Sequence, residues 1–185
     1  MEETLAIKEA LALIKLIIEE HKIILQKVQT LEQVANDASA IKGLDQAEKG
    51  FVPGRLNDQR RVLQTWQESV EIVDQGLQDH FDREETRLST AFDKCGDSML
   101  ASALRALLLE HGELRNRLAK ARKDVAELTN GGAQREVWEG RAWGARVYIT
   151  HTRKLIEAHH QSEQKLLLTL RMKLTRAVKG EDNRS

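Results

Sequence analysis

Apolar residues recur at alternating steps of three and four residues along four long stretches of this 185-residue chain. That spacing keeps side chains on one helix face and is typical of helices packed in a bundle. The chain has one proline, Pro53, and lacks runs of alternating β-branched and aromatic residues, so we expect no strands. Glycine-containing breaks separate four predicted helices, at residues 4–35, 56–91, 98–129 and 134–178. The pattern predicts one all-α domain over residues 1–185, an up-down-up-down four-helix bundle with a long connection at 36–55.

Each apolar row is interrupted once, and always by a histidine. The four residues are His21, His80, His111 and His159. A helix rises about 1.5 Å per residue, and counting from the helix ends puts these histidines at similar depths in the bundle. One histidine on an apolar face is usually a hydrogen-bonded core residue. Four at one level indicate a shared site.

Two of these histidines are followed four residues later by a glutamate. This spacing puts an imidazole and a carboxylate on one helix face, with Cβ atoms about 5–6 Å apart. The imidazole can bind one metal while the carboxylate bridges to a second metal about 3.5–4 Å away. The order of a lone histidine and then such a pair occurs twice, so we expect an approximate internal twofold. The predicted metal ligands are His21, His80, Glu84, His111, His159 and Glu163.

Three other interpretations fit the cluster less well. A buried proton-sharing network without metal would use the same residues. A ferritin-like di-iron site needs a glutamate three residues before a histidine on two helices, and this spacing occurs once, at Glu157 and His160. A structural zinc site needs only tetrahedral coordination, which six ligands exceed, and no cysteine takes part.

Four short stretches carry a family resemblance: Glu20 with His21, residues 80–85, Glu110 with His111, and residues 159–163. They resemble the hemerythrin-like, or HHE cation-binding, domains, and the resemblance covers nearly the whole chain. It implies four terminal histidines and two bridging glutamates around two iron ions, which an oxo or hydroxo group also bridges. This ligand set agrees with the one expected from the apolar rows.

Two positions depart from the oxygen-carrying members of that family. Those proteins have a fifth histidine four residues after the histidine of the third helix, where this chain has Arg115. They also commonly have aspartate where Glu163 stands. With four histidines, two bridging carboxylates and one oxygen bridge, each iron would keep one open position. This favours binding or redox chemistry with oxygen, peroxide or nitric oxide over dedicated reversible oxygen carriage.

Charge and hydropathy narrow the class of partner. The 29 basic residues balance the 29 acidic ones, which argues against a nucleic-acid or membrane partner. The apolar stretch near the first residue is interrupted by Lys8, Glu9 and Lys15, unlike a signal peptide, and no apolar run reaches membrane-spanning length. The single cysteine, Cys95, is predicted to be a surface thiol in a reducing cytoplasm.

We therefore expect a cytoplasmic di-iron protein that binds, senses or detoxifies oxygen, peroxide or nitric oxide, or that handles iron. One alternative is a di-iron oxidoreductase, such as a peroxidase or ferroxidase. Another is a helical interaction protein in which the metal only stabilises the bundle. Ligand identity defines the metal site but does not choose among these reactivities.

A few further residues are candidates to surround the ligands. Tyr148 and Thr152 could line a path to the metals or donate a hydrogen bond there, although ordinary packing would explain both. His160 lies beside the apolar row and is kept as an alternate to His159. The three tryptophans, Trp66, Trp138 and Trp143, are expected to form a cap at one end of the bundle.

Overall fold

The computed structural model describes residues 2–36, 53–94, 98–129 and 135–182, and these residues contain helices and no strand. The elements are α1 (Glu2–Asn36), α3 (Pro53–Arg83), the π-helix η1 (Glu84–Leu88), α4 (Ser89–Lys94), α5 (Ser98–Leu108), α6 (Glu110–Thr129) and α7 (Arg135–Asp182). The predicted all-helical class and the four long helical runs are confirmed for this part of the chain. The predicted connection at 36–55 lies mostly outside the described residues, as does Cys95.

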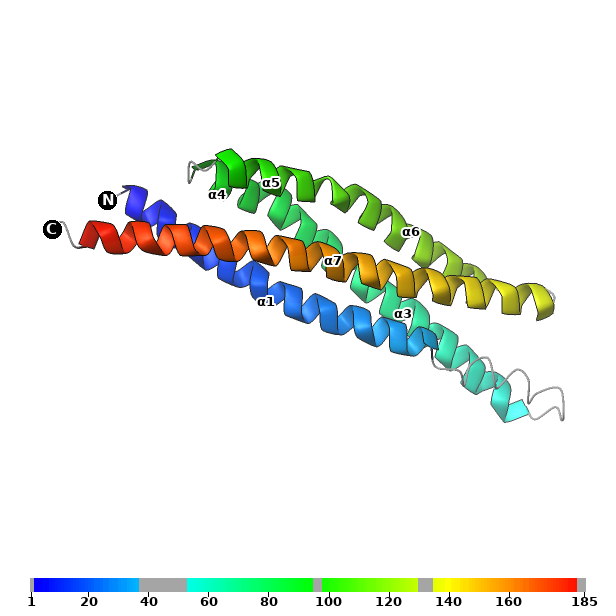
Figure 1. Cartoon of the computed structure of the whole chain (residues 1–185). Coiled ribbons are helices and arrows are strands. Elements are labelled where there is room, and N and C mark those ends of the chain that lie inside the picture. Colours follow the sequence, from blue (N-terminus) through cyan, green and yellow to red (C-terminus); the bar gives the residue numbers. More distant parts are fainter. Residues whose placement is uncertain (1, 37–52, 95–97, 130–134, 183–185) are drawn as a thin grey trace.

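The helices pack side by side along most of their length (Figure 1). α1 packs against α3 and α7, and α6 packs against the same two helices. α3 and α7 therefore face each other across the bundle, as do α1 and α6. The two termini and the junction of α4 with α5 lie at one end of the molecule (Figure 1).

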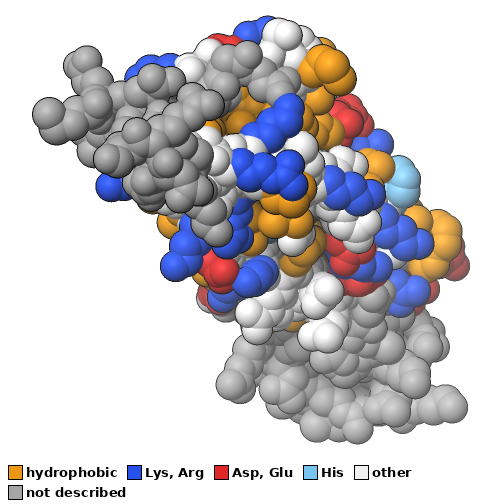
Figure 2. Space-filling model, turned by 60° about the vertical axis from the view of Figure 1, so that its left-hand side comes forward, with side chains coloured by type: hydrophobic (Ala, Val, Ile, Leu, Met, Phe, Trp, Pro, Cys, Tyr) orange, Lys and Arg blue, Asp and Glu red, His pale blue; other side chains and the backbone are white. Residues whose placement is uncertain are grey.

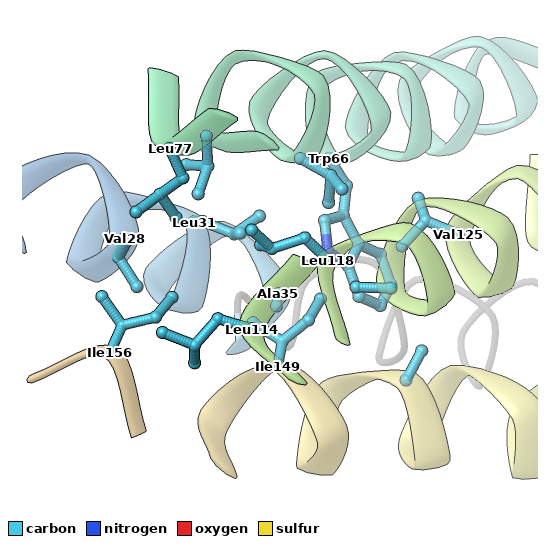
Figure 3. Packing of buried hydrophobic residues seen from close by; sticks show 14 of the residues in the cluster. Val28, Leu31, Ala35, Trp66, Leu77, Leu114, Leu118, Val125, Ile149 and Ile156 are labelled. Carbon is cyan, nitrogen blue, oxygen red and sulfur yellow. The ribbon is translucent and has the colours of Figure 1, made fainter. Parts of the chain in front are cut away.

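Among the described residues, the apolar interior consists of two clusters. One surrounds Leu77, Leu118 and Ile156, and Figure 3 shows members of this cluster pointing from the surrounding helices into a common interior. The other surrounds Ile14 and Leu170, near the end that holds the termini. The histidines and glutamates of the predicted site come from helix positions between the two clusters, so apolar packing encloses a polar layer.

Two breaks in regular α-helix fall beside that layer. The predicted helix 56–91 contains the π-helix η1, which begins at Glu84. The predicted helix 98–129 is divided at Leu109, so that α6 begins at Glu110, one residue before His111. Single-turn π-helices occur frequently at functional sites, because the extra residue changes the direction in which side chains point.

The expected tryptophan cap is correct only in part. Trp66 is buried, and Trp138 is half-buried, with its Nε1 donating to the carbonyl of Leu128 at 3.1 Å. Trp143 is 59% exposed, so its assignment to the cap was wrong. The interior face of α7 at this level carries the small residues Ala142 and Ala145, which leaves Trp143 on the solvent side.

Basic, acidic and apolar side chains are mixed on the molecular surface. Figure 2 shows many Lys and Arg side chains on one face, with acidic and apolar groups between them. None of the described helices has a stretch sufficiently long and apolar to cross a membrane.

Candidate metal centre

All six predicted ligands lie together in the polar layer, and none is more than 2% exposed. They come from α1, α3, η1, α6 and α7, so every long helical run contributes. Their nitrogen and oxygen atoms form groups that could hold a metal ion. One such group is His21, His80, Glu84 and Glu163, and another is Glu84, His111 and His159.

Glu84 lies between the two halves of the layer. Its Oε1 is 2.7 Å from Nε2 of His80 and 3.3 Å from Nε2 of His21. Its Oε2 is 3.3 Å from Nε2 of His111. One carboxylate therefore presents its two oxygens to histidines on opposite sides, which is the arrangement of a bridging ligand.

Glu163 has a similar position on the opposite side of the layer. Its Oε2 lies 3.3 Å from Nε2 of His21 and 3.7 Å from Nε2 of His159. Neither oxygen of Glu163 has a hydrogen-bond partner, because the approach of these imidazoles is close but poorly aligned. Several poorly aligned contacts that converge on one space suit a shared cation better than they suit mutual hydrogen bonds.

Three carboxylates outside the layer orient the imidazoles. Nδ1 of His80 is 2.9 Å from Glu20. The same distance separates Nδ1 of His111 from Glu85 and Nδ1 of His159 from Glu110. A carboxylate accepts the Nδ1 proton and leaves the lone pair on Nε2, the atom that faces inward. These partners are characteristic of metal-binding histidines.

Sequence reasoning did not assign a role to Glu20, Glu85 or Glu110, although a signal was present. Each is adjacent in sequence to a predicted ligand: Glu20 precedes His21, Glu85 follows Glu84, and Glu110 precedes His111. Adjacent residues on a helix project about 100° apart. When one points into the bundle, the next can reach a histidine on the neighbouring helix.

This tautomer assignment leaves lone pairs facing one another. Nε2 of His111 and Nε2 of His159 are 3.1 Å apart, and the Nδ1 atom of each is held by a carboxylate. Two lone pairs at that distance repel unless a proton or a metal ion lies between them. Nε2 of His80 lies 2.7 Å from Oε1 of Glu84, where a lone pair would also meet an acceptor unless that nitrogen carries a proton or binds a metal ion. The donor set therefore fits a cation better than it fits an apolar or neutral interior.

The pKa values of the buried glutamates and of His21 in the metal-free protein reflect the close approach of these side chains. Burial acts to raise the pKa of Glu84, but hydrogen bonds from His111, His21 and His80 outweigh it and hold that pKa well below 4.5. Burial raises the pKa of Glu163, and the nearby charge of Glu84 adds to the rise. Burial also acts to lower the pKa of His21, but Glu163 and Glu84 raise it to about 9. Without metal the layer therefore retains protons that bound cations would displace.

His160, which was expected beside the apolar row as an alternate to His159, is buried in the layer, where it is 1% exposed. Its ring stacks on His21, with centroids 4.2 Å apart and planes 13° apart. His159 and His160 are both buried because α7 packs between α1 and α6. His159 faces Glu110 and His111 on α6, while His160 faces His21 on α1.

Tyr148 and Thr152 make other contacts. The hydroxyl of Thr152 donates to the carbonyl of Tyr148 on its own helix at 2.9 Å. The Tyr148 ring packs against Arg117 and Lys120, whose cationic groups lie 5.5 Å and 5.0 Å from its centroid. These contacts account for both side chains without the polar layer.

Arg115 occupies the position where the resemblance would place a fifth histidine. Its guanidinium binds Glu85 at 2.5 Å and Asp82 at 2.8 Å, and it lies 5.3 Å from the Phe81 ring centroid. It thus holds the carboxylate that orients His111. The remaining histidine, His151, is exposed.

Comparisons with known proteins yielded no relative. No family model matches the chain. Neither a curated protein nor a solved structure matches it.

Proposed function

We propose that this protein is a hemerythrin-like non-haem di-iron protein with up-down-up-down connections, which binds a small oxidant or gas. The proposed cofactor is a pair of iron ions bridged by an oxo or hydroxo group and by the carboxylates of Glu84 and Glu163. His21 and His80 would bind one ion, and His111 and His159 the other.

The observation that carries this proposal is the position of Glu84 between the two histidine pairs. Its Oε1 faces His80 and His21 at 2.7 Å and 3.3 Å, and its Oε2 faces His111 at 3.3 Å. A site for a single metal ion would need this carboxylate to face only one of the two histidine pairs. Imidazole with carboxylate is also a donor set suited to iron, whereas closed structural zinc sites use tetrahedral sets that are commonly rich in cysteine.

Burial favours a ligand of few atoms. Every predicted ligand is at most 2% exposed, and apolar clusters enclose the layer on both sides. Oxygen, nitric oxide and peroxide are small enough for such a site. An iron pair supplies one-electron redox chemistry and open positions for these molecules. The protein residues exclude bulk water, orient the imidazoles through Glu20, Glu85 and Glu110, and release protons when the metals bind.

The test is iron content together with an optical spectrum. Protein loaded anaerobically with ferrous iron should bind two irons per chain and develop an oxo-bridge charge-transfer band in air. His80→Ala and Glu163→Ala should lose the band and the two-iron stoichiometry. His151→Ala is the matched control, because His151 is exposed and lies outside the metal groups. If the wild-type protein does not bind stoichiometric iron, the di-iron proposal fails and the polar layer is part of a purely structural bundle.

A further inference from the structure

The solvent-facing side of α5 is apolar. Met99, near the start of the helix, is 81% exposed, and Leu109, just after its last residue, is 82% exposed, the largest values among the large apolar side chains of the described residues. They lie five residues before and five residues after Leu104, which is buried. At about 100° per residue, both point away from the interior, and the small residues Ser102 and Ala106 lie between them on the same side. A contiguous exposed apolar surface of this kind marks an interaction site.

A hollow of about 480 Å³ lies beside this surface, between α5 and α7. Its apolar walls include Ala103, Ala106, Leu107 and Leu166. Its charged lining residues are Glu110, at the start of α6, and Lys165 on α7. Because an apolar hollow lies next to protruding apolar side chains, the surface is complementary to a second copy of itself, which is what a twofold contact requires.

Glu110 differs from the other two carboxylates that orient imidazoles. Glu20 and Glu85 each bind an arginine. The side chain of Glu110 is 55% exposed, and among the described residues its one ion-pair partner is His159. Lys165 follows His159 by six residues, so it lies about 9 Å farther along α7. The hollow therefore has an acidic end and a basic end.

We propose that the solvent-facing side of α5 and this hollow form the interface of a homodimer. The two copies of α5 pack antiparallel about a twofold axis that passes near Leu104. In this register Met99 of each copy lies opposite Leu109 of the other, and Ser102 lies opposite Ala106. The small central residues let the helix axes approach closely, since interaxial distance depends on the side chains at the contact.

The charges favour the antiparallel arrangement. The twofold axis reverses the hollow of the second copy, so the acidic end of one hollow meets the basic end of the other. Lys165 of each copy then pairs with Glu110 of the other copy, whereas a parallel arrangement would bring like charges together. The second copy thus supplies the cation that Glu20 and Glu85 obtain from arginines of their own chain. This interface goes beyond the binding of a small ligand and does not depend on which metal the polar layer holds.

Analytical ultracentrifugation of the full-length protein tests the dimer. The wild-type protein should pass from monomer to dimer as its concentration rises to about 1 mM, which corresponds to a weak but specific contact. Met99→Glu and Leu109→Glu each place a charge in the apolar contact and should raise the dimer Kd at least about tenfold. Ile72→Glu is the matched control, because Ile72 is also exposed but lies on α3. All three positions are exposed, so circular dichroism should show wild-type helix content in each variant.

Lys165→Glu tests the register, because it places two carboxylates together at each end of the interface. It should raise the dimer Kd at least about tenfold, whereas Lys154→Glu, at an exposed lysine of the same helix, should not. A wild-type protein that stays monomeric throughout the concentration range would overturn the proposal. So would Met99→Glu and Leu109→Glu proteins that dimerise as tightly as Ile72→Glu. Equal Kd values for Lys165→Glu and Lys154→Glu would overturn the antiparallel register. These measurements need no iron, so their outcome is separate from that of the di-iron proposal.

Discussion

Glu20 on α1 accepts a hydrogen bond at 2.9 Å from Nδ1 of His80 on α3, although it is the neighbour of His21 in sequence. The same carboxylate also accepts from Nε of Arg83, which lies 3.2 Å from its Oε2. On α1, η1 and α6, one residue thus enters the layer while its neighbour in sequence orients the histidine of an adjacent helix. The hydrogen bond holds the ring and raises the basicity of its inward nitrogen.

Replacing Glu20 with glutamine should weaken metal binding without unfolding the bundle. The amide oxygen can still accept from His80, but it carries no charge, so Nε2 becomes a poorer ligand. We expect a 10–100-fold loss of ferrous affinity, measured by chelator competition. Glu19→Gln is the control, because Glu19 is exposed and pairs only with Lys22 among the contacts described. Equal affinities for the two variants would show that the contact does not tune the metal site.

Metal removal should lower the stability of the protein. An ion that binds only the folded state, present at 100 times its dissociation constant, adds about 2.7 kcal/mol to the free energy of unfolding. We expect chelator-treated protein to melt at a lower temperature and to recover when ferrous iron is restored. Glu84→Gln should show almost no metal-dependent difference, because it loses the charge of the bridging carboxylate. An identical melting temperature with and without iron in the wild-type protein would contradict the prediction.

The metal-free protein should lose stability in acid partly through His160. Burial and the charges of His21 and His80 lower its pKa to about 2, against 6.5 for the free side chain. Between pH 6.5 and pH 2 the unfolded chain binds a proton that the folded chain does not, so stability falls as the pH falls. The contribution of this one group is about 1.4 kcal/mol per pH unit.

His160→Phe removes this group and should flatten the acid side of the stability curve by that slope. Urea unfolding of both proteins between pH 6.5 and pH 4.5 measures the difference. Distant titrating residues are common to both proteins and cancel in the comparison, whereas His21 and His80 interact with His160 and contribute to the measured difference. Parallel curves would mean that His160 takes up a proton in the folded state as readily as in the unfolded one.

Leu77→Ala should destabilise the bundle by about 2–5 kcal/mol, because Leu77 is fully buried among the core side chains of Figure 3. Ile72→Ala, a substitution of similar size on the same helix, should change stability by less than about 0.5 kcal/mol, since Ile72 is 58% exposed. Chemical denaturation of the two variants gives the comparison. Similar losses at both positions would contradict the packing described for α3.

Much of the polar layer could be predicted from sequence because the helix period is regular. Apolar residues three and four apart identify the interior face of each helix, and a histidine in that row must point the same way. His80 and Glu84 share a face for this reason alone. The ends of the helices were also close to prediction, since glycine and the single proline mark breaks that no distant contact has to create.

Tertiary structure decided the features that depend on two helices at once. The burial of His160 follows from α1 lying beside α7. The apolar row of one helix does not show how much of its circumference the neighbouring helices bury. The pairing of Glu20 with His80 joins residues 60 positions apart, which no local period encodes. The π-helix that begins at Glu84 departs from the regular helix period on which the sequence prediction rests. The sequence by itself determined which residues face the interior, because that depends on the local helix period. The tertiary structure alone decided which atoms meet there, because a contact requires the positions of both partners.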